Sequence, residues 1–583
     1  MVFTTPTWAP HLPFDPPDTI PIHQFQFDEK YGRCPFRFSR NPFTCALSGT
    51  TNSVLEIKLR IDHLARGLAK NMGWSTNVGC EWDKVVSIFS LNHIDYMVLT
   101  WAIQRLNGVC NPASASCTVE DLKHQLHDSR AKAIFTCKPL LSIALQAAVA
   151  VGIPTCCVYL IDRTAEDSNL IGAASGLKSV QDLVAQGSME SCLDEIMWQP
   201  GQGARQVAFL CYSSGTTGRP KGVCITHKNV IANVLQCSAL DKARRDLKQM
   251  SEPANPYTEN CLGILPMSHA YTISVLQLSI YRGDGTLVLP NPDLTACFRA
   301  ISEHRIATLW LVPALIDMIL KVRRIAIGYD LASVDNVVSG AAPLSEKTAD
   351  ALRIILPSCR IRQGYGLTEA STVICWTPDH DIWSGSVGSL LPGFEAKLIL
   401  EDGSEVSEYG VSGELFVRSP SISMGYHSDL QSTQDTFLNG WLRTGDEAMI
   451  CKSPLGNEHV VITDRIKDLI KVRGHQVSPS ELENFLLTHP AVSECCVVPV
   501  SDARSGEVPK AFIVKNQQYC TRECDEEVIK HEIQGYVEKN QADYKRLAGG
   551  VEFLQILPRG PGGKLLRRIL RGGSQNTTDE KSA

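Results

Sequence analysis

The most informative stretch of the sequence reads Tyr212-Ser213-Ser214-Gly215-Thr216-Thr217-Gly218-Arg219-Pro220-Lys221-Gly222. It combines glycines, hydroxyl side chains and two cations, and it contains no aliphatic side chain. Glycines let a backbone turn its N–H groups toward a ligand, and the polar side chains add donors for phosphate oxygens. Apolar runs at 207–211 and 223–225 flank the stretch and predict strands. The sequence therefore predicts a phosphate-binding loop between two strands.

This loop departs from the Walker pattern, because Pro220 stands where that pattern requires glycine. It resembles instead the phosphate loop of the adenylate-forming superfamily, which includes acyl-CoA synthetases, 4-coumarate–CoA ligases, luciferases and nonribosomal adenylation domains. The resemblance implies that Thr216 is a catalytic residue and helps to hold Mg²⁺. It also implies a set of loop residues that bind ATP, namely Ser213, Ser214, Gly215, Thr216, Thr217, Gly218 and Lys221.

Two further motifs predict a nucleoside site. In Gln363-Gly364-Tyr365-Gly366-Leu367-Thr368-Glu369 the tyrosine suits stacking on a base, the threonine can donate to a phosphate, and the glutamate can hold Mg²⁺. In Gly440-Trp441-Leu442-Arg443-Thr444-Gly445-Asp446 the aspartate can accept hydrogen bonds from both ribose hydroxyls. Alone, each would be an ordinary turn. The family match implies nucleotide binding by Gln363, Gly364, Tyr365, Gly366, Thr368 and Asp446, with Glu369 catalytic and metal-binding.

Small side chains at Ser339-Gly340-Ala341-Ala342-Pro343 allow either tight packing or a flat surface for a planar ring. The resemblance implies that Ala341 contacts adenine. His269 follows a predicted strand at 263–266, and taken alone it would more often be a core histidine. The resemblance instead implies an acyl-group pocket lined by His269, Ala270, Tyr271, Ser274, Gly340, Gly366 and Thr372.

Two basic segments lie near the C-terminus. Residues 463–477 could be a solvated charged strand, but they resemble the family's hinge motif. That resemblance implies that Arg465 binds ribose or phosphate, that Lys467 is a catalytic hinge residue, and that Lys471, also catalytic, binds coenzyme A with Arg473 and Gly474. Residues 557–568 resemble the catalytic-lysine motif, which implies that Lys564 contacts the nucleotide and stabilises the charge that develops during adenylation.

Composition is typical of an enzyme with more than one domain. The chain has 583 residues, 44% hydrophobic and 20% charged, and its net charge of -6 gives no general attraction to nucleic acid. Its 21 cysteines form no CxxC pair, which argues against zinc and favours free thiols in a reducing compartment. We find no signal peptide, membrane span or C-terminal Ser-Lys-Leu, so we expect a cytoplasmic rather than a peroxisomal protein.

Alternating predicted strands and helices indicate an α/β fold. We expect a large N-terminal domain over 1–464, with two α/β sheets and a β region at 385–465, and we expect residues 1–45 to lie across its surface. A hinge at 465–468 would lead to a small mobile α+β domain over 469–571 and a disordered tail at 572–583. Ser478-Pro479-Ser480-Glu481 predicts a helix start with a capping box.

The resemblance predicts ATP-dependent activation of a carboxylic acid, either an aryl acid or a medium-chain or fatty acid, through an acyl adenylate, with transfer to coenzyme A. Specialised metabolism is a plausible setting by analogy. An alternative is a stand-alone ligase that loads a carrier protein of a polyketide or nonribosomal synthetase. A nucleotide-responsive scaffold without catalysis is disfavoured, because Glu369, Asp446 and Lys564 are all present. The sequence does not determine the acid or the oligomeric state.

Overall fold

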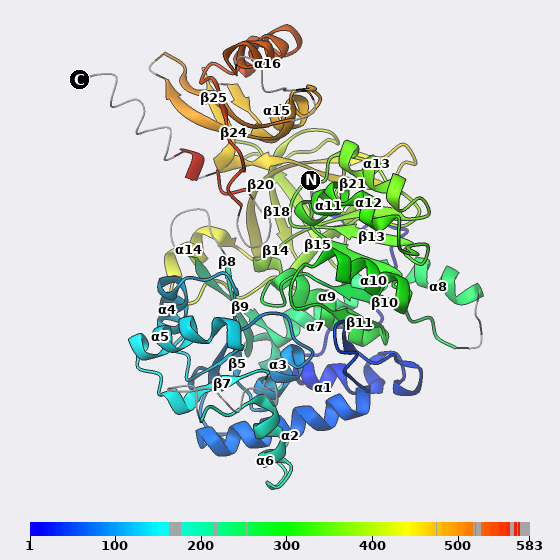
Figure 1. Cartoon of the computed structure of the whole chain (residues 1–583), viewed down its shortest axis with the longest axis vertical. Helices are drawn as coiled ribbons and strands as arrows, with labels where there is room; N and C mark the ends of the chain where they lie inside the picture. The colour runs from blue at the N-terminus through cyan, green and yellow to red at the C-terminus, as the bar shows by residue number, and fades with distance from the viewer. Residues whose placement is uncertain are drawn as a thin grey trace.

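Helices and strands alternate along most of the chain, as Figure 1 shows for a computed structural model. The structure describes residues 1–162, 176–213, 220–251, 253, 255–473, 475–502, 504–516, 519, 526–559, 565–567 and 569–571. The α-helices in this part of the chain are α1 Ile22–Gln26, α2 Val54–Met72, α3 Tyr96–Arg105, α4 Val119–Asp128, α5 Leu141–Val151, α6 Val180–Gly187, α7 His227–Leu240, α8 Lys242–Ser251, α9 Ala270–Arg282, α10 Leu294–His304, α11 Pro313–Lys321, α12 Arg323–Ala326, α13 Glu346–Ile355, α14 Leu430–Thr436, α15 Pro479–Leu486 and α16 Glu526–Asn540.

The first sheet carries the two strands on either side of the predicted phosphate loop. Its order among the described residues is β7-β6-β4-β5-β8-β9, parallel except for the antiparallel pair β8 and β9. The strands are β4 Val85–Phe89, β5 Val109–Ala113, β6 Ala133–Thr136, β7 Val158–Leu160, β8 Val207–Ser213 and β9 Lys221–Thr226. The prediction that the loop joins two strands is confirmed. Every residue of β4 to β7 is buried, as expected for a parallel sheet covered by helices.

The second sheet carries the strand that leads into the predicted nucleoside motif. Its order is β16-β15-β14-β13-β12-β10-β11-β2-β3, with a parallel centre and antiparallel edges. The strands are β2 Phe43–Cys45, β3 Thr51–Asn52, β10 Asn260–Gly263, β11 Gly285–Val288, β12 Thr308–Leu311, β13 Asn336–Ser339, β14 Arg360–Leu367, β15 Thr372–Trp376 and β16 Ser389–Leu390. Helices α7 and α9 pack against each other and against β15, and α7 also contacts β9 of the first sheet.

An antiparallel sheet follows in the region where β structure was predicted. Its order is β1-β17-β18-β20-β19, with β21 paired to β20. The strands are β1 Phe3–Thr4, β17 Glu395–Ile399, β18 Gly413–Arg418, β19 Phe437–Leu438, β20 Trp441–Lys452 and β21 Glu458–Arg465. This sheet and the two before it form one large N-terminal body, so the predicted α/β fold class is confirmed.

A small α+β unit forms the top of the molecule in Figure 1. Its sheet has the order β23-β22-β25-β24, with β26 paired to β25, and α15 and α16 contribute to its core. The strands are β22 Ile470–Val472, β23 His475–Val477, β24 Val492–Asp502, β25 Gly506–Lys515 and β26 Val551–Phe553. The Ser478 hydroxyl accepts a hydrogen bond from the Glu481 N–H (3.1 Å), as predicted. The predicted capping box is wrong, because the Glu481 carboxylate pairs with Lys545 instead.

Two other predictions require correction. Residues 1–45 do not simply lie across the surface: β1 and β2 join two different sheets, and Ile22 and Phe25 of α1 are fully buried. Their aromatic and aliphatic side chains fill the core between the helices. The strand predicted at 263–266 is the earlier β10, because the chain leaves the sheet after Gly263.

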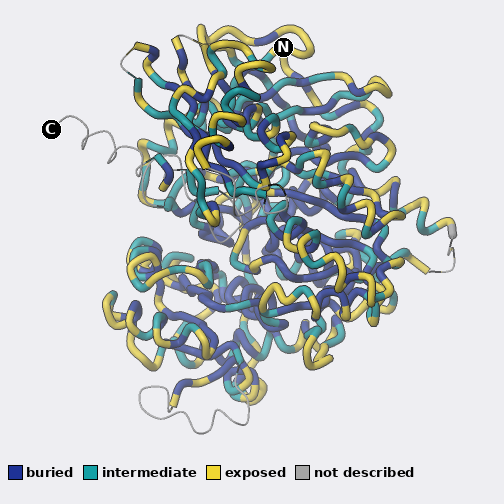
Figure 2. The backbone as a smooth tube through the Cα atoms, turned by 45° about the horizontal axis from the view of Figure 1, so that its top comes forward, coloured by how far each residue is buried: buried dark blue, intermediate teal, exposed yellow. Residues whose placement is uncertain are grey.

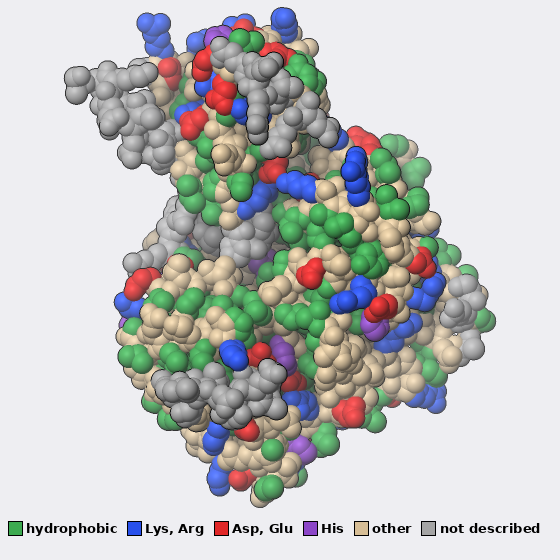
Figure 3. All heavy atoms as spheres, in the orientation of Figure 1, with side chains coloured by type: hydrophobic (Ala, Val, Ile, Leu, Met, Phe, Trp, Pro, Cys, Tyr) green, Lys and Arg blue, Asp and Glu red, His purple; other side chains and the backbone are tan. Residues whose placement is uncertain are grey.

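In Figure 2 the buried residues lie mainly inside the large body and the exposed residues mainly along its outline. Figure 3 shows a waist between the small unit and the large body. Within the described part of the chain, no helix has the length and apolar character needed to cross a lipid bilayer.

Candidate functional site

The turn after β14 brings Glu369 to the end of β8. Glu369 lies in the short helix η8 (Thr368–Ala370), with Thr368 half-buried beside it. Its Oε1 accepts hydrogen bonds from the Ser213 hydroxyl (3.0 Å) and the Tyr426 hydroxyl (2.9 Å). Ser213 is the last residue of β8, 156 residues away in sequence. The first and second sheets therefore meet at the predicted metal-binding carboxylate.

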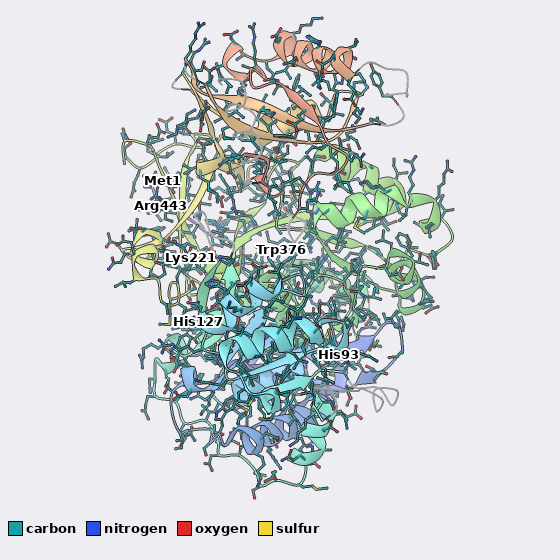
Figure 4. The ribbon with its side chains drawn as sticks, turned by 60° about the vertical axis from the view of Figure 1, so that its left-hand side comes forward. Met1, His93, His127, Lys221, Trp376 and Arg443 are labelled. Carbon is teal, nitrogen blue, oxygen red and sulfur yellow. The ribbon has the colours of Figure 1, made fainter. Side chains whose placement is uncertain are left out.

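Lys221 begins β9 at the other end of the phosphate loop. Its ammonium lies 3.1 Å from the Asp429 carboxylate and 5.4 Å from the centre of the Tyr426 ring, and it donates to the Ser432 hydroxyl. In Figure 4, Lys221 lies beside helix α14, which follows Asp429. The predicted loop residues Ser214, Gly215, Thr216, Thr217 and Gly218 lie outside the described residues.

Tyr365 and Asp446 meet across two sheets. The Tyr365 hydroxyl donates to Asp446 Oδ2 (2.6 Å), and Arg465 Nε lies 3.4 Å from Asp446 Oδ1. Asp446 on β20 stands opposite Arg465 on β21, which fixes this pair through strand register. Burial, together with the Asp446 charge, raises the pKa of Tyr365 well above its usual value, so the phenol keeps its proton and donates. The three residues predicted to contact the nucleoside are thus together.

Backbone geometry around β14 explains its glycines. A Cβ on Gly366 would lie 1.4 Å from the Thr372 carbonyl oxygen, so no side chain fits there. Thr372 itself has a φ of 111°, a strained value for a β-branched residue. Gln363 is bound on both sides: its Oε1 accepts from the Leu344 N–H (3.1 Å), and its Nε2 donates to the Ser386 carbonyl (3.3 Å). Gln363 therefore supports the strand that carries Tyr365.

The small-residue turn after β13 lies against this strand. A Cβ on Gly340 would contact the Tyr271 ring at 3.3 Å and the Gly364 carbonyl oxygen at 3.5 Å. Ala341 follows it with a φ of 68°, in the left-handed region that few residues other than glycine adopt. A Cβ on Gly364 would meet only a carbonyl oxygen at 3.8 Å. Gly340, Ala341 and Gly364 therefore form one surface of small residues.

The residues predicted to line the acyl pocket are in part engaged with the protein itself. His269 is exposed and caps α9, its Nδ1 accepting from the Tyr271 N–H (3.2 Å), so it is not a core histidine. Ala270 is buried beside it. The Tyr271 hydroxyl donates to the Val338 carbonyl (3.2 Å). The Ser274 hydroxyl donates to the Ser371 carbonyl (3.1 Å), which holds the strained backbone that leads to Thr372.

The predicted hinge lies directly after Arg465. Lys467 is in the short helix η9 (Ile466–Asp468), and burial, followed by the charge of Arg465, lowers its pKa. Asp468 pairs with Arg571 (3.0 Å) near the end of the described chain. Asp464, the residue before Arg465, accepts from the Ser478 hydroxyl (2.7 Å), so a hydrogen bond joins the large body to the small unit directly before the hinge segment.

The described residues predicted to bind coenzyme A, Lys471 and Arg473, belong to the small unit. The Lys471 N–H donates to Glu507 (2.9 Å), and Arg473 Nε donates to the Ser505 hydroxyl (3.2 Å). Gly474 and Lys564 lie outside the described residues. Arg559 and Leu565 pair as an antiparallel bridge, which brackets the segment containing Lys564.

Sequence reasoning missed two residues of the site, Tyr426 and Asp429. Tyr426 is 57 residues from Glu369, and nothing in its neighbourhood indicates the contact. The sequence before α14 carries an N-cap signal, since the Asp429 carboxylate accepts from the Ser432 N–H (2.9 Å), but this signal does not predict the ion pair with Lys221.

The donor set fits a magnesium ion bound together with phosphates. The described residues contain no group of three His, Cys, Asp or Glu side chains that could hold a metal by themselves. A single half-buried carboxylate beside a phosphate loop is typical of Mg²⁺, which usually binds through one or two carboxylates and substrate phosphates. Among the described residues, Glu369 is the one that could hold it.

Comparison with protein families matches the AMP-binding enzyme family over residues 39–427 and the C-terminal domain of AMP-binding enzymes over residues 481–564. The chain is 38% identical to the acyl-CoA ligase AFT1-1 of Alternaria alternata, covering 100% of this chain and 99% of that protein. It is 36% identical to the acyl-CoA ligase easD of Emericella nidulans, covering 98% and 100% respectively.

Among solved structures, the anthranilate CoA ligase AuaEII in complex with anthranoyl-AMP aligns with a TM-score of 0.79 at 20% identity, covering 97% of this chain and 99% of that chain. ATP-bound MatB from Rhodopseudomonas palustris aligns with a TM-score of 0.78 at 22% identity, covering 96% and 99% respectively. At these identities the likeness concerns the fold alone.

Proposed function

The chain belongs to the AMP-binding enzyme family, and we propose that it is an ATP-dependent acyl-CoA ligase. The carboxylate of an acid attacks the α-phosphorus of ATP, and the bond to the β-phosphate breaks to release pyrophosphate. The thiol of coenzyme A then attacks the acyl carbonyl carbon of the acyl adenylate and loses its proton, and AMP departs with the bonding electron pair.

The observation that carries this proposal is the position of Tyr365 and Glu369 on one strand and its turn. Tyr365 meets Asp446, a carboxylate suited to ribose hydroxyls, while Glu369 meets Ser213 at the start of the phosphate loop. A nucleotide whose ribose contacts Asp446 would direct its phosphates toward Glu369 and the loop. This spacing suits a bound ATP and the cleavage of its α–β phosphate bond.

The other predicted site residues would bind the metal ion, the pyrophosphate or the ribose. Glu369 and Thr216 would hold Mg²⁺, which when bound neutralises charge on the phosphates. Lys221 and the loop residues would donate to the leaving pyrophosphate. Arg465, beside Asp446, would contact the ribose or the α-phosphate.

We infer that the small unit rotates about Lys467, with 1–464 and 469–571 as the two rigid parts. Lys564 would serve the adenylation step, and Lys471 with Arg473 and Gly474 would serve thioester formation. The ion pairs and hydrogen bonds of Asp464 and Asp468 on either side of Lys467 support this, because a bend there would exchange a few contacts and preserve both cores.

The acyl pocket would lie between α9 and the Gly340 turn. Small residues and the Tyr271 ring suit an aryl acid or a medium aliphatic chain. We place the reaction in the cytosol, since the cysteines of the described residues are free thiols, as a reducing compartment requires. The names of the fungal relatives support a biosynthetic role in specialised metabolism.

The test is pyrophosphate release from ATP with a panel of aryl, medium-chain and long-chain acids. Thioester formation is then followed with coenzyme A and, in parallel, with a pantetheinylated carrier protein. Lys564→Ala should abolish pyrophosphate exchange, and Lys471→Ala should spare exchange but slow thioester formation. Exchange at the wild-type rate in Lys564→Ala would refute its role. If the acyl group is transferred to the carrier protein and not to coenzyme A, the carrier protein is the acceptor.

A further inference from the structure

Residues 424–429 run along the strand that leaves the phosphate loop. The Cys224 N–H donates to the Gly425 carbonyl (2.9 Å), and the His427 N–H donates to the Gly222 carbonyl (2.7 Å). Between these bonds, Tyr426 forms an antiparallel bridge with Val223 of β9. Tyr426 is therefore fixed to β9 by its backbone on both sides.

The side chain of Tyr426 is held equally firmly. Its ring packs edge-on against Phe437 with 5.8 Å between ring centres, and the backbone N–H of Tyr426 donates to the Thr433 hydroxyl (2.9 Å). The Lys221 ammonium lies on the ring at 5.4 Å from its centre. With the ring held in this way, the hydroxyl donates to Glu369 Oε1 (2.9 Å).

Both donors to Glu369 bind the same carboxylate oxygen. The hydroxyls of Tyr426 and Ser213 both donate to Oε1, and no described residue donates to Oε2. The Tyr426 hydroxyl is the donor in this pair, because the oxygens of an ionised carboxylate only accept. A carboxylate held this way presents one oxygen to the protein and the other to a ligand.

We propose that Tyr426 is a positioning residue for the metal carboxylate: its hydroxyl orients Glu369 so that Oε2 is free to bind the Mg²⁺ of Mg·ATP. Second-sphere donors of this kind orient a ligand and restrict its motion before the metal binds. The same ring contacts Lys221 at one end of the phosphate loop, while Glu369 accepts from Ser213 at the other end. The inference rests on the proposed function, because it concerns the same ATP site.

Tyr426→Phe removes only the hydroxyl and keeps the ring against Phe437 and Lys221. Tyr409→Phe is the matched control, because the Tyr409 hydroxyl also donates to a glutamate, Glu458, on the exposed surface. The readout is calorimetric binding of a non-hydrolysable ATP analogue, with and without Mg²⁺. We expect Tyr426→Phe to weaken Mg²⁺-dependent binding about tenfold and leave metal-free binding unchanged. Tyr409→Phe should change neither.

A double-mutant cycle with Glu369→Gln tests whether Tyr426 acts through the carboxylate. In that background Tyr426→Phe should have no further effect on Mg²⁺-dependent binding, since there is no carboxylate left to orient. Equal losses with and without Mg²⁺, no loss, or full additivity in the cycle would each overturn the proposal. If Tyr426→Phe does not fold, Ser213→Ala removes the other donor to Oε1 and takes its place in the cycle. Because Ser213 belongs to the predicted ATP-binding loop, only its additional loss of binding in the presence of Mg²⁺ is compared, and an additional loss that persists with Glu369→Gln would overturn the proposal.

The two proposals fail separately. If Tyr426→Phe weakens Mg²⁺-dependent ATP binding but the wild type forms no acyl adenylate with any acid, the ligase function is wrong and the positioning role stands. If the wild type forms thioesters but Tyr426→Phe binds Mg·ATP like the wild type, the positioning role is wrong and the ligase function stands.

Discussion

Replacement of His227 should reduce the amount by which the free energy of unfolding falls between pH 7 and pH 5. His227 begins α7, is 0% exposed, and accepts a hydrogen bond at Nδ1 from the Ile22 N–H (3.0 Å). Trp198 packs edge-on against it at 4.9 Å. Burial lowers its pKa from 6.5 to about 3, because a protonated ring would lose its hydration.

The direction of the effect follows from linkage. Between pH 6.5 and about 3 the unfolded chain binds a proton at His227 and the folded chain does not, so acid stabilises the unfolded state. The contribution of the neutral ring is complete above pH 6.5 and is lost as the pH falls. At about 1.4 kcal/mol per pH unit, the loss is about 2 kcal/mol between pH 7 and pH 5.

His227→Asn is the informative variant, because its Oδ1 can keep an acceptor near the Ile22 N–H and it does not titrate. Urea unfolding of both proteins at several pH values gives the difference in free energy of unfolding. That difference should shrink by about 2 kcal/mol from pH 7 to pH 5. Other titrating groups, such as His23, are present in both proteins and contribute to the pH dependence of each. A difference independent of pH would refute the reasoning.

Three further outcomes concern the nucleotide site. Gly366→Ala places a methyl carbon 1.4 Å from a carbonyl oxygen, so calorimetry should find the affinity for ATP reduced about a hundredfold. Gly535→Ala, where nothing lies within 4 Å of the added carbon, should leave the affinity unchanged. Equal effects of the two substitutions would contradict the steric argument. Asp446→Asn should raise the KM for ATP about tenfold in pyrophosphate exchange, and the exposed Asp402→Asn should not; an unaltered KM in the first would exclude the ribose role. Chelation of Mg²⁺ should stop pyrophosphate release. Without ATP no tight Mg²⁺ site should be measurable, since Glu369 belongs to no cluster of three ligands among the described residues. A tight Mg²⁺ site in the ATP-free protein would contradict binding of the metal jointly by Glu369 and the phosphates of ATP.

Local sequence patterns predicted most of the elements correctly. The apolar runs at 207–211 and 223–225 lie in β8 and β9, and Ser478 caps α15 as predicted. The prediction failed for residues 1–45, where strands of two or three residues are too short to show a period. Phe3, for example, joins a sheet only through Ala396, a partner that no local pattern indicates.

The candidate site divides in the same way. Ser213, Tyr365, Glu369 and Asp446 were predicted from their motifs, and the structure brings them together in two hydrogen-bonded pairs. Their catalytic roles remain predictions. Tyr426 was not predicted, because its only relevant property is the direction of one hydroxyl across the sheet junction.

The sequence by itself determined the chemistry available to this protein: a glycine- and hydroxyl-rich loop, a tyrosine between glycines, and carboxylates at turns, in an order that identified the superfamily. Those properties depend on residue type and short spacing, which a sequence displays directly. Only the tertiary structure decided which groups meet. Contacts across 57, 81 and 156 residues join Glu369 to Tyr426, Tyr365 to Asp446 and Ser213 to Glu369. Such contacts depend on strand order and on the packing of separate sheets, and on no local period in the chain.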